Sequence, residues 1–181
     1  MAGRVNYKIV FNLVLTVILI GILGFNYQQE KLTREDIANT QGRPPAIGSL
    51  VPEFYVTDAN GKKVRFQDLQ EWTAMIVFWN IGCQPSVRFL EALCELDFAD
   101  SPVQVMPVSV VDSLDAVRAF YEQRGWDFPI YVDADRSTKW AFKVTITPSF
   151  YLINNEGKIV YRQLGSSQQG FDYVANWVGS Y

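Results

Sequence analysis

The chain has 181 residues, of which 49% are hydrophobic and 19% charged, and its net charge is −3. This composition excludes a disordered chain, and the length allows one ordinary domain with an appendage but not two full-sized domains. The chain contains no histidine and two cysteines, too few ligands for a cysteine-only zinc site and too few thiols for a disulfide framework. We therefore expect no metal and no cofactor, and the negative charge gives no overall attraction for nucleic acid.

The amino-terminal residues carry charge of the opposite sign. Residues 1–25 hold Arg4 and Lys8 and no acid, so they carry +2, while the remaining 14 basic and 19 acidic residues give −5. Residues 9–25 form an uncharged, apolar run of 17 residues. As a helix this run spans ~26 Å, close to the ~30 Å hydrocarbon core of a bilayer. An acidic body behind a basic, apolar leader predicts a domain that is tethered to a membrane.

The leader is either a cleaved signal peptide or a retained anchor. Cleavage requires a pattern of small residues after the apolar run, and the run instead ends in Phe25-Asn26-Tyr27-Gln28. We therefore favour a transmembrane signal anchor at residues 1–27, and the basic residues before it predict a cytoplasmic amino terminus. The protein is then expected to cross the cell membrane once, with an extracytoplasmic (periplasmic) domain.

The rest of the chain is predicted to be a linker and one folded domain. Residues 28–45 are polar and end in a Gly-Arg-Pro-Pro sequence that stops a helix, so we expect a stalk there and a domain at residues 46–181. Strands alternate with helices in this domain, which predicts an α/β sheet covered on both faces. The predicted strands are 54–57, 62–66, 73–79, 103–111, 130–132, 150–153 and 159–164. The predicted helices begin after residue 83, after a cap at Asp112 or Ser113, at 136 and at 169.

One position in the domain carries chemistry. The apolar strand 73–79 is broken by residues 80–85, and Cys83 within this break opens a helix. The start of a helix presents unpaired N–H groups and the positive end of the helix dipole, and both stabilise a thiolate. Pro85 fits the first helical turn, because its missing N–H is not needed there. Cys83 is therefore predicted to be a nucleophilic thiol.

Four segments around this cysteine form a recognisable set. They are Phe78-Trp79 before the cysteine, Cys83-Gln84-Pro85-Ser86, Thr147-Pro148, and the strand–turn–strand sequence at 150–160. In these segments the chain resembles the thioredoxin superfamily, specifically its membrane-anchored TlpA/ResA-like (redoxin) branch, over most of residues 46–181. The resemblance implies a thioredoxin-like fold, a central mixed sheet flanked by helices, with a cis-proline at Pro148. It also implies catalytic positions at Cys83 and Ser86 and substrate contacts from Trp79, Gln84, Pro85, Thr147 and Pro148.

The chain departs from the family pattern where proton transfer and resolution of the mixed disulfide take place. Ser86 stands at the second cysteine of the CxxC motif, so Cys83 has no resolving partner in the motif. Gly82 replaces the tryptophan that is usual before the first cysteine. Val77 and Phe89 replace a buried aspartate and a glutamate that relatives carry. We expect only water or Ser86 to handle protons beside Cys83.

The second cysteine is not expected to supply the missing thiol. Cys94 lies 11 residues after Cys83, or ~16 Å along one helix. A disulfide needs Cα atoms within ~7 Å. We expect Cys94 to be a small apolar core residue and Trp140 to lie on the inner face of its helix. Asp133 and Asp135 are expected to serve a turn and a helix cap.

Two functions stay open at this point. The first is thiol–disulfide exchange with a protein thiol or disulfide partner through the single cysteine Cys83, with an external thiol needed for release. The second is a redox-inactive accessory or binding subunit of a membrane protein complex, which uses the thioredoxin fold as a docking module. Ser86 favours the second function, whereas the presence of Cys83 together with Pro148 favours the first.

Overall fold

The computed structural model describes residues 16, 18–22, 24, 42–69, 73–96, 98 and 101–179. The chain divides into two compact units, Met1–Arg43 and Pro44–Tyr181. The second unit is the folded domain, and it begins two residues before the predicted start at Ala46. Its first residues are held in place because Arg162 donates hydrogen bonds to the carbonyl oxygens of Pro44 and Pro45, at 3.2 and 2.9 Å.

The predicted anchor at residues 1–27 and most of the predicted stalk at 28–45 lie outside the described residues. The described part of the apolar run, Thr16, 18–22 and Gly24, is helical and exposed. Within the parts of the chain that the structure describes, no helix combines the length and the apolar character needed to cross a membrane.

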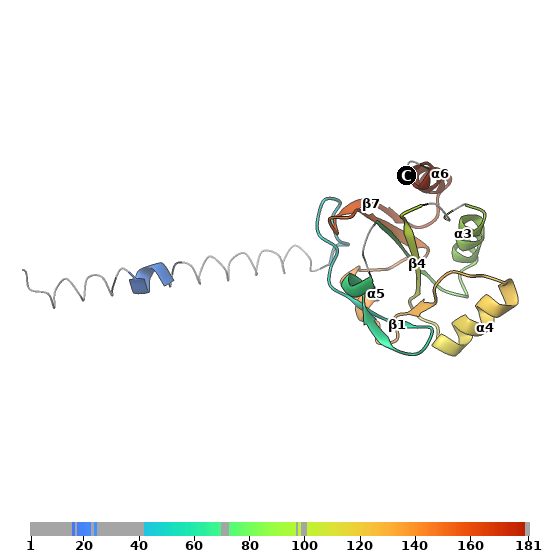
Figure 1. Ribbon diagram of the computed structural model, residues 1–181, viewed down its shortest axis with the longest axis horizontal. Helices are drawn as coiled ribbons and strands as arrows, with labels where there is room; N and C mark the ends of the chain where they lie inside the picture. Colours follow the sequence, from blue (N-terminus) through green and yellow to red (C-terminus); the bar gives the residue numbers. More distant parts are fainter. Residues whose placement is uncertain are drawn as a thin grey trace, which may run out of the picture. The chain divides into compact units, whose positions relative to one another are not determined.

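A seven-stranded mixed sheet forms the centre of the domain (Figure 1). The strand order is β2-β1-β5-β4-β3-β6-β7. β3, β4 and β5 run parallel, whereas the β1–β2, β1–β5, β3–β6 and β6–β7 pairs are antiparallel. The central mixed sheet that was expected is thereby confirmed. The strands are β1 (Tyr55–Asp58), β2 (Lys63–Arg65), β3 (Ala74–Trp79), β4 (Gln104–Ser109), β5 (Tyr131–Val132), β6 (Ser149–Ile153) and β7 (Ile159–Leu164).

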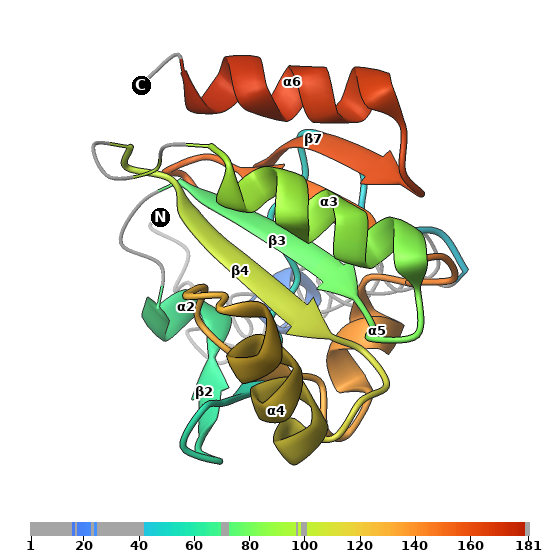
Figure 2. The same cartoon turned by 90° about the vertical axis from the view of Figure 1, so that its right-hand side faces the viewer.

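Helices cover both faces of this sheet. α3 (Gln84–Cys94), α4 (Leu114–Arg124) and α6 (Gln168–Val178) pack on one face, where α3 lies in front of β3 and next to α6 (Figure 2). The opposite face is covered by α2 (Phe66–Leu69) and α5 (Ser137–Ala141). The active-site candidate Cys83 lies between β3 and α3, at the carboxyl end of the central strand.

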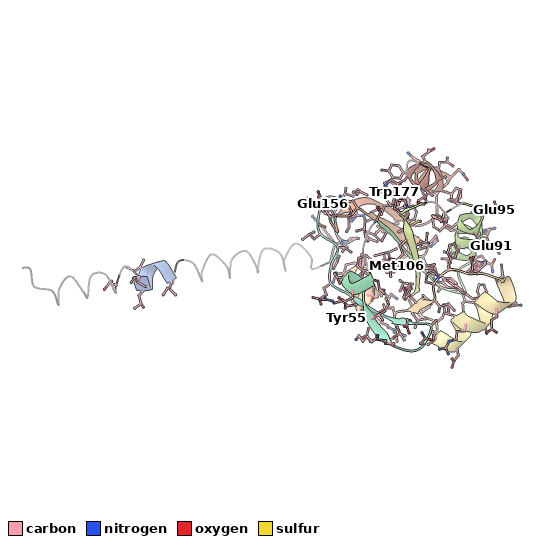
Figure 3. The ribbon with its side chains drawn as sticks, viewed as in Figure 1. Tyr55, Glu91, Glu95, Met106, Glu156 and Trp177 are labelled. Atoms are coloured by element: carbon pink, nitrogen blue, oxygen red, sulfur yellow. The ribbon has the colours of Figure 1, made fainter. Side chains whose placement is uncertain are left out.

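The alternation of side chains along β3 divides the core into two layers, because successive residues of a strand point to opposite faces. Ala74, Ile76 and Phe78 belong to the layer under α2 and α5, and their neighbours Met75, Val77 and Trp79 belong to the layer under α3, α4 and α6. All six residues are fully buried, as the continuous apolar run predicted. In Figure 3 Met106 of β4 lies in the interior of the domain, while Glu91 and Glu95 lie at its periphery.

The turns and caps follow the sequence signals. Asp58 Oδ1 accepts hydrogen bonds from the N–H groups of Asn60 and Lys62, both at 2.9 Å, in the turn between β1 and β2. Gly61 in this turn has a φ of +79°, which glycine adopts without strain. Ser113 caps α4 by accepting from the N–H of Ala116 at 3.3 Å, which decides between the two predicted caps.

The short helix α5 departs from its prediction in one respect. Its N-cap residue is Arg136, and the carboxylate of Asp133 satisfies the first turn by accepting from the N–H groups of Thr138 and Lys139 at 3.0 and 2.6 Å. Trp140, expected on the inner face, is 68% exposed, so that prediction is wrong. The reason is geometric: α5 has five residues, and its buried contacts are made by Thr138 and by Phe142 just after the helix. α2 was not predicted at all, because a four-residue helix carries no periodic pattern.

Candidate functional site

Cys83 is the residue before the first turn of α3. Its backbone is extended, with φ −97° and ψ 96°, and its carbonyl accepts the N–H of Val87 at 3.1 Å. Pro85 occupies the first helical turn, as predicted, and the cysteine side chain is partly exposed. The thiol therefore stands at the positive end of an 11-residue helix, within reach of solvent.

The segment before β6 forms the wall opposite the thiol. The peptide bond between Thr147 and Pro148 is cis, which confirms the expectation from the family resemblance. Cys83 Sγ donates a hydrogen bond to the carbonyl oxygen of Thr147 at 3.2 Å. The two segments come together because β3 and β6 pair in the sheet, with Phe78 opposite Ser149. Residues 64 positions apart thus form one site.

Asn80 ties the two walls to each other, a role that the sequence did not reveal. Its side-chain amide donates to Thr147 Oγ1 at 2.9 Å, and its backbone carbonyl oxygen accepts the N–H of Cys83 at 3.2 Å. One residue thus holds both the backbone of the cysteine and the side chain that faces it. We infer that Asn80 is a positioning residue of the site.

Asp112 steadies the same loop from the neighbouring strand. Its Oδ2 atom accepts the N–H of Ile81 at 2.9 Å and the hydroxyl of Ser109 at 2.8 Å. Since β3 and β4 are parallel neighbours, their carboxyl ends meet at one edge of the sheet, and this brings Asp112 to the loop after β3. The available signal was the placement of an acidic residue just after a strand that runs parallel to the one before Cys83.

The electrostatic surroundings favour the thiolate at Cys83. Partial burial by itself raises the pKa of this thiol, but hydrogen bonds that the thiolate can accept from the side chains of Ser86 and Thr147 and from the backbone of Ser86 outweigh it and lower the pKa below its ordinary value. The proximity of α3's first N–H groups acts in the same sense. The nucleophilic form is thus more populated at neutral pH than for a free cysteine.

Ser86 is fully buried below the thiol. Its hydroxyl is unpaired among the described residues while Cys83 is a neutral thiol, and it lies close enough to the sulfur to lower the pKa of Cys83. A hydroxyl group rotates freely, so it can turn its proton to the sulfur once the sulfur carries negative charge. Ser86 is therefore placed to support the thiolate, but it cannot touch a bound substrate.

The other predicted site residues fall into two groups. Gln84 and Pro85 are exposed beside Cys83, and Thr147 is partly exposed, so all three are accessible to a substrate. Pro148 is buried, so it supports the wall of the site from inside, whereas the partly exposed Thr147 forms the surface of this wall. Trp79 is 0% exposed and packs against Tyr121 and other aromatic rings under α4. Trp79 therefore cannot contact a substrate, and the substrate contact predicted for it is wrong.

Cys94 does not lie in the core, so the prediction for this residue is wrong. Cys94 is the last residue of α3 and is exposed there, whereas Leu93 just before it is buried. Partial burial of its sulfur and the negative charges of Asp127 and Glu91 raise the pKa of the Cys94 thiol. The two cysteines thus lie at opposite ends of α3, and the surroundings change their pKa values in opposite directions.

A helix-start cysteine beside a cis-proline, on a mixed sheet covered by helices on both faces, defines a thiol–disulfide site of the thioredoxin type. The model of the AhpC/TSA family matches residues 47–162. The chain is 31% identical over 131 residues to the thiol-disulfide oxidoreductase ResA of Bacillus subtilis, which covers 70% of this chain and 73% of that protein. With ResA of Bacillus thuringiensis it shares 26% over 160 residues, 87% of this chain and 88% of the relative.

The solved structures agree with this assignment. A thioredoxin-like protein from Porphyromonas gingivalis superposes with a TM-score of 0.63 at 25% identity and covers 72% of this chain and 90% of its own. The protein belongs to the AhpC/TSA family and, within the thioredoxin superfamily, to the ResA-like branch. It is thus a thioredoxin-fold protein of the thiol–disulfide oxidoreductase type.

Proposed function

We propose that this protein exchanges disulfides with protein partners through one cysteine, Cys83, outside the cytoplasm and anchored to the cell membrane by residues 1–27. The observation that carries the proposal is the position of the Cys83 thiol. It stands at the start of α3, partly exposed, 3.2 Å from the Thr147 carbonyl and with a lowered pKa. Asn80 and Ser86 are proposed to position and support the thiolate, and Gln84, Pro85 and Thr147 to contact the substrate.

The exchange proceeds in two displacement steps. The Cys83 thiolate attacks one sulfur of a substrate disulfide, the S–S bond breaks, and the departing sulfur leaves as a thiolate that takes a proton from water. A mixed disulfide between Cys83 and the substrate results. An external thiolate then attacks the substrate sulfur of this mixed disulfide, which forms a new disulfide on the substrate and regenerates the Cys83 thiolate.

The external thiol is needed because neither internal candidate can act. Ser86 carries a hydroxyl where relatives with CxxC carry the resolving thiol. Cys94 lies at the far end of α3, ~16 Å along the helix axis, beyond the ~7 Å between Cα atoms that a disulfide allows. We therefore propose a monothiol exchange and not the dithiol cycle.

A second function has one specific observation in its favour. Ser86 stands where relatives with CxxC carry the resolving thiol, so the motif leaves Cys83 without a partner that could complete an exchange. In an accessory subunit of a membrane complex the surface around Cys83 would dock onto a partner and the thiol would stay unreacted. The two functions differ in whether Cys83 forms a covalent bond.

Purified protein treated with a peptide disulfide distinguishes them. We expect the full chain and Cys94→Ser to form one mixed disulfide per chain, visible by mass spectrometry, and Cys83→Ser to form none at the site. We also expect no thioredoxin-like rate of protein disulfide reduction with dithiothreitol, since nothing resolves the intermediate internally. A Cys94→Ser protein that does not react with the peptide would support the accessory function instead.

The membrane part of the proposal has its own test. The protein is expected in the membrane pellet after an alkaline carbonate wash, because an uncleaved apolar helix of residues 9–25 holds it there. Protease added from outside should digest the domain. A mature amino terminus between residues 21 and 30 would show that the leader is a cleaved signal peptide, and the anchor would then be withdrawn.

A further inference from the structure

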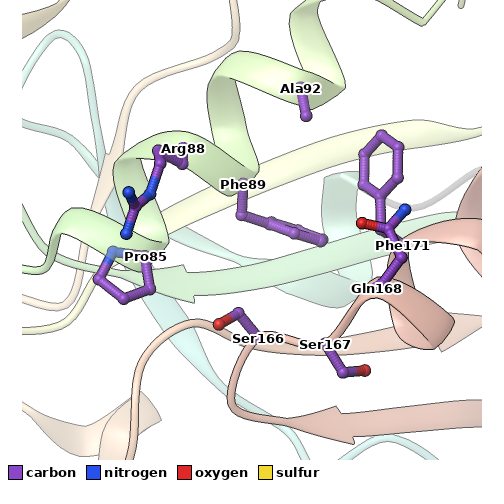
Figure 4. Close-up of a pocket in the computed structure, with 8 residues that line it drawn as sticks. All are labelled: Pro85, Arg88, Phe89, Ala92, Ser166, Ser167, Gln168 and Phe171. Carbon is purple, nitrogen blue, oxygen red and sulfur yellow. The ribbon is translucent and has the colours of Figure 1, made fainter.

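A groove runs along α3 from the neighbourhood of Cys83. It lies between α3 and the amino-terminal half of α6 and has a volume of about 430 Å³ (Figure 4). Pro85, one of the proposed substrate contacts, lines the groove, so the groove begins two residues from Cys83 along the chain. On the other side it is bounded by the loop after β7 and by Phe171 of α6.

The floor of the groove is apolar and rigid. Phe89 is 6% exposed and stacks on Phe150 of β6, with ring centroids 5.1 Å apart and an interplanar angle of 16°. Phe171 meets the same ring edge-on, with centroids 6.0 Å apart and an angle of 85°. Rings that are held by two neighbours keep their positions, so the groove presents a preformed apolar surface for a side chain of a partner.

Among the described residues that line the groove, Arg88 alone is charged. Arg88 is exposed and lies on the same side of the groove as Pro85 in Figure 4. Among the described residues it pairs with no carboxylate, whereas Arg124 nearby on α4 pairs with Glu91. The remaining lining residues are neutral, and the first turn of α6 begins at the groove with Ser167 as its cap. An acidic group is therefore favoured here, although the protein as a whole is negative.

The spacing matches a peptide attached at Cys83. Arg88 follows Cys83 by five residues, or ~7.5 Å along the helix, and an extended peptide advances ~3.3 Å per residue. A residue two positions from the reacting cysteine of a substrate thus reaches Arg88. Phe89 lies one residue further along the helix, ~9 Å from Cys83, so a residue three positions from the reacting cysteine lies over it.

The structure assigns this groove to the segment of the substrate polypeptide that flanks its reacting cysteine, with an apolar residue over Phe89 and an acidic residue against Arg88. The inference rests on the proposed function, since the substrate must be held at Cys83. It adds a preference among substrates: the protein selects disulfides in acidic and apolar sequence surroundings. The occupant is a partner polypeptide, and the recognition is made by α3 and α6 outside the CxxS motif.

Three synthetic peptides test this assignment. Each contains one cysteine as a mixed disulfide with thionitrobenzoate, glutamate, glutamine or lysine two residues away on both sides, and leucine three residues away on both sides. Cys83 attacks the peptide sulfur, the peptide becomes attached, and the coloured thionitrobenzoate anion leaves. The rate constants are measured on the full chain with Cys94→Ser. An exposed ion pair contributes about 0.2–1 kcal/mol, so the glutamate peptide should react about 1.4- to fivefold faster than the glutamine peptide.

The matched controls are Arg88→Glu and Lys62→Glu, which change the net charge equally. Lys62 lies exposed in the β1–β2 turn and does not line the groove. We expect Arg88→Glu to reverse the order of the glutamate and lysine peptides, and Lys62→Glu to keep it. If the ratio of the rate constants for the glutamate and lysine peptides is the same in the two variants, the groove assignment is overturned, while exchange at Cys83 stays intact. No reaction with any peptide would overturn the proposed function itself.

Discussion

Replacement of Ser86 by alanine should reduce the reactivity of Cys83 without loss of stability. The Ser86 hydroxyl is buried and has no partner of ordinary geometry in the described part of the chain while Cys83 carries its proton. We expect it to donate a hydrogen bond to the sulfur when the thiolate forms. The folded protein therefore does not depend on this hydroxyl, but the charged state of the nucleophile does.

The two effects can be estimated separately. A hydrogen bond to a charged group is worth about 1.5–3 kcal/mol, and the partial exposure of Cys83 favours the lower end. Because about 1.4 kcal/mol corresponds to a factor of ten, the thiolate population at a fixed pH below its midpoint should fall about tenfold in Ser86→Ala. A buried polar group without a partner costs about 1–3 kcal/mol, so the free energy of unfolding should stay constant or rise by about 1 kcal/mol.

The assay is the rate of alkylation by iodoacetamide as a function of pH, in Cys94→Ser, together with urea unfolding. Thr138→Val is a matched control, since its buried hydroxyl does have a partner, the Tyr55 carbonyl at 2.7 Å. This control should lose about 1 kcal/mol of stability and keep its alkylation profile. If Ser86→Ala instead loses stability and keeps the alkylation profile, Ser86 has a structural role alone and the reasoning is refuted.

Three further results are expected. In the native protein Cys83 should alkylate faster than Cys94 near neutral pH. The midpoint of the pH–rate profile of Cys83 should lie below the midpoint of a free thiol, and the midpoint of Cys94 above it. Peptide mapping of the labelled protein checks this, and equal labelling of the two cysteines would contradict the opposite pKa shifts. Ser86→Cys should form a disulfide with Cys83, because residues three apart on a helix lie about 5–6 Å apart. This variant should also gain a partial dithiol reductase activity. A variant that forms the disulfide but exchanges with no substrate would argue for the accessory function. Asn80→Ala should slow alkylation of Cys83 several-fold and move the midpoint of its pH–rate profile to higher pH, because the side chain of Thr147 loses its hydrogen bond. The free energy of unfolding in urea should fall by about 1 kcal/mol. An unchanged pH profile would show that Asn80 only stabilises the fold.

The strands, the main helices and the position of Cys83 at a helix start could be predicted because their signals are local. The run before Cys83 is continuous and apolar, as expected of a central strand buried on both faces. The cysteine lies directly between this strand and a helix with Pro85 in its first turn. The position of the cis-proline was available only through the family resemblance, since nothing in the spacing of Thr147 and Pro148 alone indicates it.

The parts that were missed depend on contacts between distant segments. The hydrogen bonds of Asn80 and Asp112 span 67 and 31 residues, and no pattern in the sequence announces them. The exposure of Cys94 is an end effect, because it is the last residue of α3 and no further helical turn covers it. Trp140 was misplaced for a related reason, since a five-residue helix has too few positions to define an inner face.

The central claim is that Cys83 forms covalent intermediates with partner proteins. Cells that express the full chain can be quenched with acid, alkylated, and compared by non-reducing electrophoresis and mass spectrometry with cells that express Cys83→Ser and Cys94→Ser. Monothiol exchange predicts reducible adducts joined to Cys83, present in Cys94→Ser and absent in Cys83→Ser. Cys83 recovered entirely as the free thiol, in cells where other extracytoplasmic disulfides form, would contradict the account.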